Sequence, residues 1–367
     1  MESSSAARGV CVNAPATLKG GTVGQLRKGR RGWITLSLIC TFVSLSIHFV
    51  YAEEVKRKIR FGIQTPAEVA DPGDLIRLWQ EAEGWGFDTA WTFDHFMPIS
   101  GNTQGPCQDG WTLLSALATQ TTKIRIGCLV TGNTYRHPAV LAKMATTVDH
   151  LSHGRLELGI GAGWFEPEHR AYGIPFYTAK ERAQRLAEAV QIILSLWTEK
   201  ETTFTGKYYQ IDHAPFEPKP LQQPHPPILI GGVGKKWTLP VIAQYADEWN
   251  MLPSSPEKMA DLIKTLNGYC DKYKRDCKKI EKSHLTRLVL TDDPQAIDQA
   301  VQGLARVMRI PPEQARATIL AGSPEAVKKQ IQTYIDNGVT HIIIGQRPPY
   351  DRKGLERFAK EVMPTFR

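Results

Sequence analysis

Short apolar runs rich in β-forming residues alternate along most of the chain with longer stretches that carry helix signals. The short runs predict strands, because turn-forming residues bound them, and the longer amphipathic stretches predict helices. The strand candidates are 59–64, 89–93, 124–130, a run that opens at 155, 228–230, 248–251, 285–290 and 341–344. The predicted helices are 74–85, 111–119, 138–151, 180–197, 238–245, 256–272, stretches within 295–320 and 323–336, and a last one from 352.

Regular alternation of strand and helix is typical of βα units on a parallel sheet. The eight strand candidates therefore predict an α/β protein, a (β/α)₈ TIM barrel over residues 57–367. Residues 198–227 break the rhythm with a small hairpin at 203–209 and a proline-rich run to Pro227. We interpret this stretch as an insertion after the fourth βα unit that serves as a lid or a wall.

Residues 1–56 form a separate leader. From Trp33 to Ala52 the chain has no Asp, Glu, Lys or Arg, and basic residues precede this run, including the Arg30-Arg31 pair. A basic region before an apolar segment is typical of a signal peptide, and the pair resembles the twin-arginine export signal. A run of ~20 residues can also span a bilayer. Three interpretations stay open: export, a membrane anchor through residues 33–52, and a cytoplasmic protein whose start codon is mis-assigned.

The net charge of +8 is concentrated in the leader, since residues 1–60 hold ten Lys or Arg and three Glu. The remaining chain is close to neutral, so we expect no nucleic-acid partner. The six cysteines form no CxxC pair or His/Cys cluster, and we expect no metal. Cys270 and Cys277 lie seven residues apart, which on a helix is a rise of ~10 Å, so we interpret all six as thiols.

The ends of the predicted strands carry the candidate site, because in a barrel they face one mouth. Strand two ends in Asp94-His95, and the imidazole of His95 can give or take a proton near neutral pH. Asp94 is expected to orient His95, to hold the polar edge of a cofactor, or simply to cap the next turn. Strand three ends in Leu129-Val130 and the loop with Asn133.

Glycines follow strands four and five. The run from Arg155 breaks into Gly159, Gly161 and Gly163, and strand five leads into Gly231-Gly232-Val233-Gly234. Such loops let the backbone approach a ligand, and their N–H groups can hold a phosphate. Trp164 is expected to form a wall of the pocket rather than to act chemically.

Several motifs together resemble one family. They are the Asp94-His95 strand end, VTGNTYRHP at 130–138, GRLELGIGAGW at 154–164, YGIPF at 172–176, FTGKY at 204–208 and PPILIGGVG at 226–234. The chain is similar to the bacterial luciferase-like flavin-dependent oxidoreductases, and most similar to the branch that uses the 8-hydroxy-5-deazaflavin coenzyme F-420. The resemblance covers nearly everything after residue 57.

The resemblance implies a barrel, a homodimer, and a cofactor lying across the carboxyl ends of the strands. His95 matches an acid or base beside the cofactor ring, with Asp94 near the polar edge of the ring. Leu129 and Val130 match a bulge that supports the ring, commonly with a non-proline cis peptide bond. The loops containing Gly161, Gly163, Gly231, Gly232, Val233 and Gly234 match those near the ribityl and phosphate groups.

The resemblance implies an oxidoreductase that transfers hydride between coenzyme F-420 and a small organic substrate. Trp164 and Ile99 stand where the sugar-phosphate dehydrogenases of this branch have a glutamate and a tryptophan, which argues against sugar-phosphate oxidation. The alternative is an FMN-dependent monooxygenase on the same barrel, and a third class is a cofactor carrier without turnover.

Overall fold

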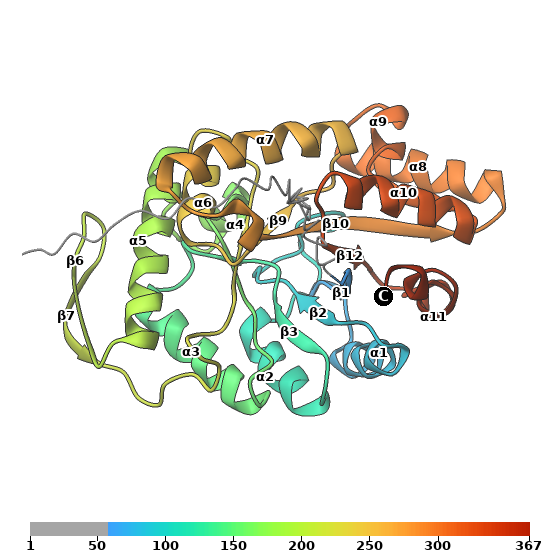
Figure 1. The fold of residues 1–367 in the computed structure, drawn as a ribbon. Coiled ribbons are helices and arrows are strands. Elements are labelled where there is room, and N and C mark those ends of the chain that lie inside the picture. Colours follow the sequence, from blue (N-terminus) through green and yellow to red (C-terminus); the bar gives the residue numbers. More distant parts are fainter. Residues whose placement is uncertain (1–57) are drawn as a thin grey trace, which may run out of the picture. The chain divides into compact units, whose positions relative to one another are not determined.

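The computed structural model describes residues 58–367, and these form a barrel of parallel strands with helices around it (Figure 1). The predicted leader, with its signal peptide, twin-arginine and anchor interpretations, lies outside the described residues. Within residues 58–367, no helix has the length and apolar character needed to span a membrane.

Eight parallel strands make the barrel: β1 (Arg60–Gln64), β2 (Thr89–Thr92), β3 (Arg125–Cys128), β5 (Leu158–Gly161), β8 (Ile228–Gly231), β9 (Glu248–Met251), β10 (Glu281–Leu290) and β12 (His341–Gly345). They are hydrogen-bonded in the order β3-β2-β1-β12-β10-β9-β8-β5, and short β4 (Thr131–Gly132) pairs with β5. A parallel bridge between Ile126 and Leu156 joins β3 to the chain before β5 and closes the ring. The predicted (β/α)₈ barrel is confirmed.

Helices follow the barrel strands: α1 (Pro72–Trp85), α2 (Gly110–Gln120), α3 (Pro138–Leu151), α4 (Glu166–Ala171), α5 (Ala179–Thr198), α6 (Thr238–Tyr245), α7 (Pro256–Tyr273), α8 (Pro294–Met308), α9 (Pro312–Arg316), α10 (Pro324–Asp336) and α11 (Arg352–Glu361). Local sequence explains where several begin. Asp71 accepts a hydrogen bond from the Asp74 N–H at 2.8 Å, and Ser255 accepts one from the Lys258 N–H. These caps satisfy N–H groups that lack a partner within the helix.

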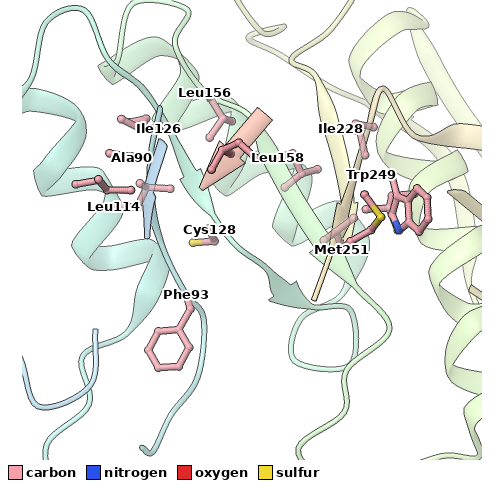
Figure 2. Close-up of a cluster of buried hydrophobic side chains, with 14 of the residues drawn as sticks. Ala90, Phe93, Leu114, Ile126, Cys128, Leu156, Leu158, Ile228, Trp249 and Met251 are labelled. Atoms are coloured by element: carbon pink, nitrogen blue, oxygen red, sulfur yellow. The ribbon is translucent and has the colours of Figure 1, made fainter. Parts of the chain in front are cut away.

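The core lies mainly between the barrel and its helices. Figure 2 shows Ala90 of β2, Ile126 of β3 and Leu114 of α2 packed together, all of them buried. A smaller cluster fills the barrel itself and includes Trp91, Leu129, Leu229 and Ile343. At the amino ends of the strands, Arg60 donates to Glu157 at 2.5 Å and to Glu281 at 2.7 Å. Charged side chains that pair with one another therefore occupy that end of the barrel.

One predicted helical region proved wrong in part. Within 295–320 the chain forms α8 and α9, but Ile319–Gly322 is a strand, β11, parallel to Arg287–Leu290 of β10. β10 is also longer than predicted, since it begins at Glu281 rather than Leu285. Figure 1 shows β10 as the long orange strand that runs on beside α8 and α10. This extension offers a free edge to β11, and a partner strand distant in sequence cannot be read from local pattern.

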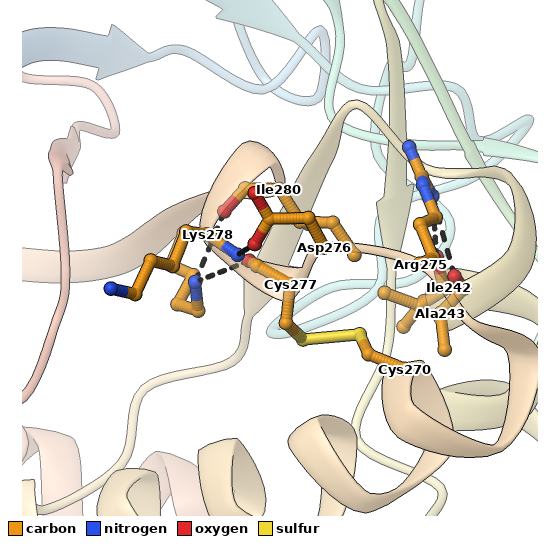
Figure 3. The surroundings of a disulfide bond; sticks show 9 residues. Ile242, Ala243, Cys270, Arg275, Asp276, Cys277, Lys278 and Ile280 are labelled. Carbon is orange, nitrogen blue, oxygen red and sulfur yellow. Dashed lines mark hydrogen bonds between the residues drawn. A yellow bond between two sulfur atoms is a disulfide. The ribbon is translucent and has the colours of Figure 1, made fainter. Parts of the chain in front are cut away.

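The expectation that all six cysteines are thiols is also wrong. Cys270 and Cys277 form a disulfide, with their Cα atoms 5.6 Å apart (Figure 3). The estimate of ~10 Å assumed a continuous helix, but α7 ends at Tyr273 and Lys274 adopts a left-handed conformation, with φ of 55°. The chain then turns back and brings Cys277 beside Cys270. The other two cysteines in the described part of the chain, Cys107 and Cys128, are free.

The stretch at 198–227 contains the predicted hairpin. Its strands are β6 (Glu201–Thr205) and β7 (Gln210–Pro215), which pair antiparallel as a separate sheet. Glu188 of α5 accepts hydrogen bonds from the N–H groups of Lys207 and Tyr208, both at 2.9 Å. The carboxylate therefore satisfies the turn and fastens the hairpin to α5.

Candidate active site

A cavity of about 1060 Å³ opens at the carboxyl ends of the barrel strands. This is the end at which barrel enzymes place their sites. Most of the residues predicted from the sequence line it, namely His95, Leu129, Val130, Gly161, Gly163, Trp164, Gly231, Gly232, Val233 and Gly234. The structure therefore brings together side chains and loops from four strand ends. No residue of 198–227 lines the cavity, and the lid interpretation of that stretch stays a prediction.

His95 follows β2 and is 6% exposed. Its Nδ1 lies 2.9 Å from Oε2 of Glu168. Within the described residues, Nε2 has no hydrogen-bond partner, and the ring lines the cavity. When Nδ1–H donates to the carboxylate, Nε2 is the nitrogen left to exchange a proton with a ligand.

Glu168 holds this arrangement in place. It is fully buried at 0% exposure and accepts hydrogen bonds from the Tyr135 hydroxyl and the Phe96 N–H as well as from His95. Burial alone would raise the pKa of Glu168, but the hydrogen bonds from His95, Tyr135 and Phe96 outweigh it and lower the pKa. Glu168 is therefore an ionised carboxylate at neutral pH.

Sequence reasoning missed Glu168 and Tyr135 as site residues. A signal was present, because Glu168 belongs to the acidic stretch directly after the strand-four glycines, and Tyr135 lies in the loop after strand three. An acidic residue after a strand end of a barrel is a candidate site residue. Its partner could not be named, since His95 lies 73 positions away in the chain.

Asp94 does not reach the cavity. Its carboxylate is buried, forms an ion pair with Arg136 and accepts from the Thr131 hydroxyl. Arg136 also binds Asp109, the N-cap of α2, at 2.8 Å. The structure thus gives Asp94 a role in joining the loops after β2 and β3, and no contact with His95 or with the cavity wall supports its predicted role at the cofactor.

Asn133 is also absent from the cavity wall. It is buried, and its Nδ2 lies 3.3 Å from the hydroxyl of Tyr209. The amide therefore ties the loop after β3 to the β6-β7 hairpin. In the described part of the chain, no group of three or more His, Cys, Asp or Glu side chains could hold a metal ion.

Leu129 and Val130 both line the cavity. The peptide bond between them is cis, which confirms the expectation of a non-proline cis peptide bond, and the Gln64 side chain donates to the Leu129 carbonyl at 2.9 Å. Val130 lies against two glycines. A Cβ at Gly161 would come within 2.9 Å of Val130 Cγ2, and one at Gly231 within 3.1 Å of Val130 Cγ1. The glycines therefore make room for Val130 in the cavity wall.

The loop at 231–234 leads into α6 and forms one end of the cavity. Gly232 has φ of 140°, and a Cβ there would lie 2.9 Å from Thr238 Cγ2. Only glycine adopts this backbone conformation without a clash, so Gly232 allows the tight turn between β8 and α6. The first N–H groups of α6 donate to the Gly234 carbonyl, and the Gly232 N–H donates to the Asn250 carbonyl. Within residues 58–367, the N–H groups of Val233 and Gly234 are therefore those left to hold an anion.

Arg182 supplies positive charge to the cavity, whereas Lys235 and Lys236, which follow the glycine loop in the sequence, do not. Neither lysine lines the cavity, and Lys235 pairs with Asp261 at 2.5 Å. Arg182 does line it, and its Nε is buried without a partner within residues 58–367. A buried unpaired guanidinium N–H is costly unless a ligand accepts from it.

Trp164 lines the cavity at 61% exposure, and its ring centroid lies 6.1 Å from that of His95 at an interplanar angle of 80°. The predicted position as a pocket wall is confirmed. Ile99 lines the cavity as well. Neither side chain acts as an acid or base near neutral pH, so neither can take the place of His95 in proton transfer.

Comparisons with known proteins agree with this geometry. Residues 58–309 match the family model described as luciferase-like monooxygenase. The F420-dependent glucose-6-phosphate dehydrogenase of Amycolatopsis mediterranei is 28% identical over 340 residues, which cover 84% of this chain and 99% of that protein.

Two solved structures share the fold. An F420-dependent secondary alcohol dehydrogenase in complex with an F420-acetone adduct has a TM-score of 0.75 and 21% identity, over 84% of this chain and 99% of that one. A monooxygenase from Streptomyces bottropensis has a TM-score of 0.70 and 21% identity, over 84% of this chain and 100% of that one. The shared fold thus accommodates two reaction classes.

Proposed function

This chain belongs to the luciferase-like monooxygenase family, and we propose that it is an oxidoreductase dependent on coenzyme F-420 that transfers hydride to or from a small organic substrate. The observation that carries the proposal is the His95-Glu168 pair, which presents one free imidazole nitrogen to a cavity of about 1060 Å³. The relative from Amycolatopsis mediterranei, which is F420-dependent by name, supports the choice of cofactor.

The residues present fit coenzyme F-420. Val130 and the glycines at 161 and 231 leave a smooth wall against which a flat ring system can lie. The loop at 231–234 and the unpaired Nε of Arg182 would hold its phosphate. When bound, the deazaflavin supplies a carrier that gives or takes two electrons as a hydride.

The chain itself orients the reacting groups, supplies or accepts a proton, and excludes water from the site. Glu168 fixes Nδ1 of His95, so that Nε2 donates a proton to the reduced substrate, or accepts one in the reverse direction. The wall contributed by Phe93, Leu129, Val130 and Trp164 is apolar and limits access of water to the reacting atoms.

We propose that the substrate is not a sugar phosphate. Trp164 and Ile99 occupy positions where the resemblance implies a glutamate acid and a tryptophan, and both line the cavity. This apolar wall is a better match for a conjugated or carbonyl compound than for a polyhydroxylated compound such as a sugar. Such a substrate would be reduced by hydride and would take a proton from His95.

Titration tests the cofactor. Trp164 and Trp237 both line the cavity, so binding of a planar cofactor there should quench intrinsic fluorescence. We expect coenzyme F-420 to bind and FMN not to bind. Tight binding of FMN alone, with oxygen consumption in the presence of a flavin reductase, would make the protein a monooxygenase instead. If neither coenzyme F-420 nor FMN binds, the proposed function is wrong.

We also propose that residues 1–56 direct export and that the protein is a homodimer. The basic residues before the uncharged run at 33–52 support export, and the family resemblance supports the dimer. The mass and the cell fraction of the native protein test the first proposal, because cleavage removes the leader, whereas an anchor leaves it in the membrane fraction. Size-exclusion chromatography with light scattering tests the second.

A further inference from the structure

The cavity extends beyond the mouth of the barrel. Its second part, here called the apolar arm, lies where β10 runs past the barrel beside α8 and β11. The residues of the apolar arm are Leu252, Pro253, Leu288, Val289, Ala300, Gly303, Leu304, Val307 and Ile319. The cavity volume of about 1060 Å³ lies at the upper end of the range of about 300–1000 Å³ that is usual for the pocket of one small molecule.

The apolar arm is open rather than filled by its own side chains. Val307 is 58% exposed and Leu252 is 53% exposed, although both line the cavity. The wall behind them is well packed, because Leu304, Ile319 and Val289 belong to a small hydrophobic cluster between α8, β10 and β11. Exposed apolar side chains on a well-packed wall indicate a surface that an apolar ligand covers.

A positive charge stands at the base of the apolar arm. Arg287 lines the cavity and lies directly before Leu288 and Val289 on β10. Within residues 58–367, the guanidinium of Arg287 makes no ion pair or hydrogen bond. Burial, and next to it the charge of Arg347, lower the pKa of Arg287, but a guanidinium remains protonated at neutral pH.

The surrounding charges do not neutralise Arg287. Arg347 is already paired with Glu68 and donates to the Ser100 hydroxyl at 2.5 Å. The charged residues of the cavity wall, His95 aside, are Arg182, Arg287, Arg347 and Asp351. Asp351 is occupied as the N-cap of α11, where it accepts from the Gly354 N–H at 2.8 Å. The cavity is therefore electropositive, and Arg287 is its uncompensated guanidinium beside the apolar arm.

We propose that the substrate is an organic anion with an apolar body, whose acid group binds Arg287 while the body lies in the apolar arm. This inference rests on the proposed function, because it assigns the substrate of the same cavity. The arm is a poor match for a polar cofactor tail, since its lining from Leu288 to Ile319 carries no hydrogen-bonding side chain. The loop at 231–234 and Arg182 already offer a separate place for the cofactor phosphate.

Binding without cofactor tests the substrate class directly. Calorimetric titration of the full chain with decanoate, decan-1-ol and acetate separates the charge from the apolar body. We expect decanoate to bind about ten to a hundred times more tightly than decan-1-ol, as for a charge-assisted hydrogen bond. Acetate should bind more weakly than decanoate by a similar factor. Equal binding of decanoate and decan-1-ol, or no binding of decanoate, would overturn the proposal.

Variants locate the site. Arg287→Met keeps the length of the side chain without its charge and should remove the preference for decanoate, whereas Arg306→Met, on the exposed side of α8, should not. Val307→Asn should weaken decanoate binding and leave acetate binding unchanged. Retained melting temperatures establish that the variants are folded. If Arg287→Met weakens binding of coenzyme F-420 instead of decanoate, Arg287 belongs to the cofactor site and the proposal fails.

The two proposals fail in different ways. Decanoate titration uses neither coenzyme F-420 nor turnover. Decanoate binding through Arg287 together with no binding of coenzyme F-420 would refute the proposed function and keep the anion site. Cofactor binding without any preference for decanoate would keep the function and refute the substrate class.

Discussion

Replacing Glu168 by Gln tests the role of the carboxylate behind His95. The carboxylate accepts from three donors, at His95, Tyr135 and Phe96. A glutamine has one acceptor oxygen and one donor group, so its NH₂ must face at least one of these donors. If the oxygen stays with the Phe96 N–H, the NH₂ faces Nδ1 of His95 and favours the tautomer with the proton on Nε2. A neutral imidazole in that tautomer cannot accept a proton from a ligand.

The magnitude follows from the lost interaction. A hydrogen bond between charged groups contributes about 1.5–3 kcal/mol, which is about 10- to 150-fold in rate when it is made in the transition state. We therefore expect Glu168→Gln to lower kcat/KM by about 10- to 150-fold. One donor left without an acceptor should also lower the free energy of unfolding by about 1–3 kcal/mol. Coenzyme F-420 should still bind, because Glu168 does not line the cavity.

Two measurements check this reasoning. Nitrogen-15 NMR of the histidine rings, with His95 assigned from the spectrum of His95→Gln, should show Nδ1–H in the native protein and Nε2–H in Glu168→Gln. Steady-state kinetics should show the loss of kcat/KM. The matched control is Glu166→Gln on the same helix, whose carboxylate pairs with Arg170 at the surface and should leave both readouts unchanged. An unchanged His95 tautomer with unchanged kinetics would refute the role of Glu168.

Three further predictions concern stability and the glycine loop. Burial would raise the pKa of Glu83, but the N–H groups of residues 122–124 outweigh it and lower the pKa to about 2; its stabilisation is therefore full above pH ~4.5 and lost as the pH falls towards 2. In urea unfolding at pH 7, Glu83→Gln should be about 1–2 kcal/mol less stable than wild type, after allowance for solvent screening. The difference in the free energy of unfolding should be smaller at pH 3.5. The same difference at both pH values would refute the role of the ionised Glu83 carboxylate. Reduction of Cys270–Cys277 should add two reactive thiols in a denatured thiol assay and lower the free energy of unfolding by about 2 kcal/mol, as expected for a short loop; an unchanged thiol count would show that the bond is absent. Gly232→Ala should weaken coenzyme F-420 binding about tenfold because its Cβ meets Thr238, whereas Gly268→Ala, with open space around its Cβ, should leave binding unchanged and add about 0.5–1 kcal/mol of stability.

The barrel could be predicted because its determinants are local. Strand runs such as 228–230 and helix signals such as the Asp71 cap are properties of adjacent residues, and eight repeats of strand and helix admit few arrangements. β11 could not be predicted with them. Residues 319–322 become a strand because the extension of β10 provides a partner, and that partner lies about thirty positions earlier in the chain.

The candidate site divides in the same way. Glycine loops and the strand-end histidine could be found from the sequence, since a backbone that needs glycine and a residue that follows a strand are both visible locally. The partners of the polar side chains could not. Asp94 was expected at the cofactor, but Arg136 reaches it from another loop, and Arg182 of α5 brings positive charge to the cavity from a helix distant in the sequence.

The sequence by itself thus determined the order of the elements, the barrel and the presence of His95 and the glycine loops at its mouth, because propensity, periodicity and backbone conformation depend on neighbouring residues. Only the tertiary structure decided that Glu168 holds His95, that Cys277 meets Cys270 and that Arg287 is left without a partner. Each of these depends on distances between residues that the fold brings together or keeps apart, and no local pattern encodes such a distance.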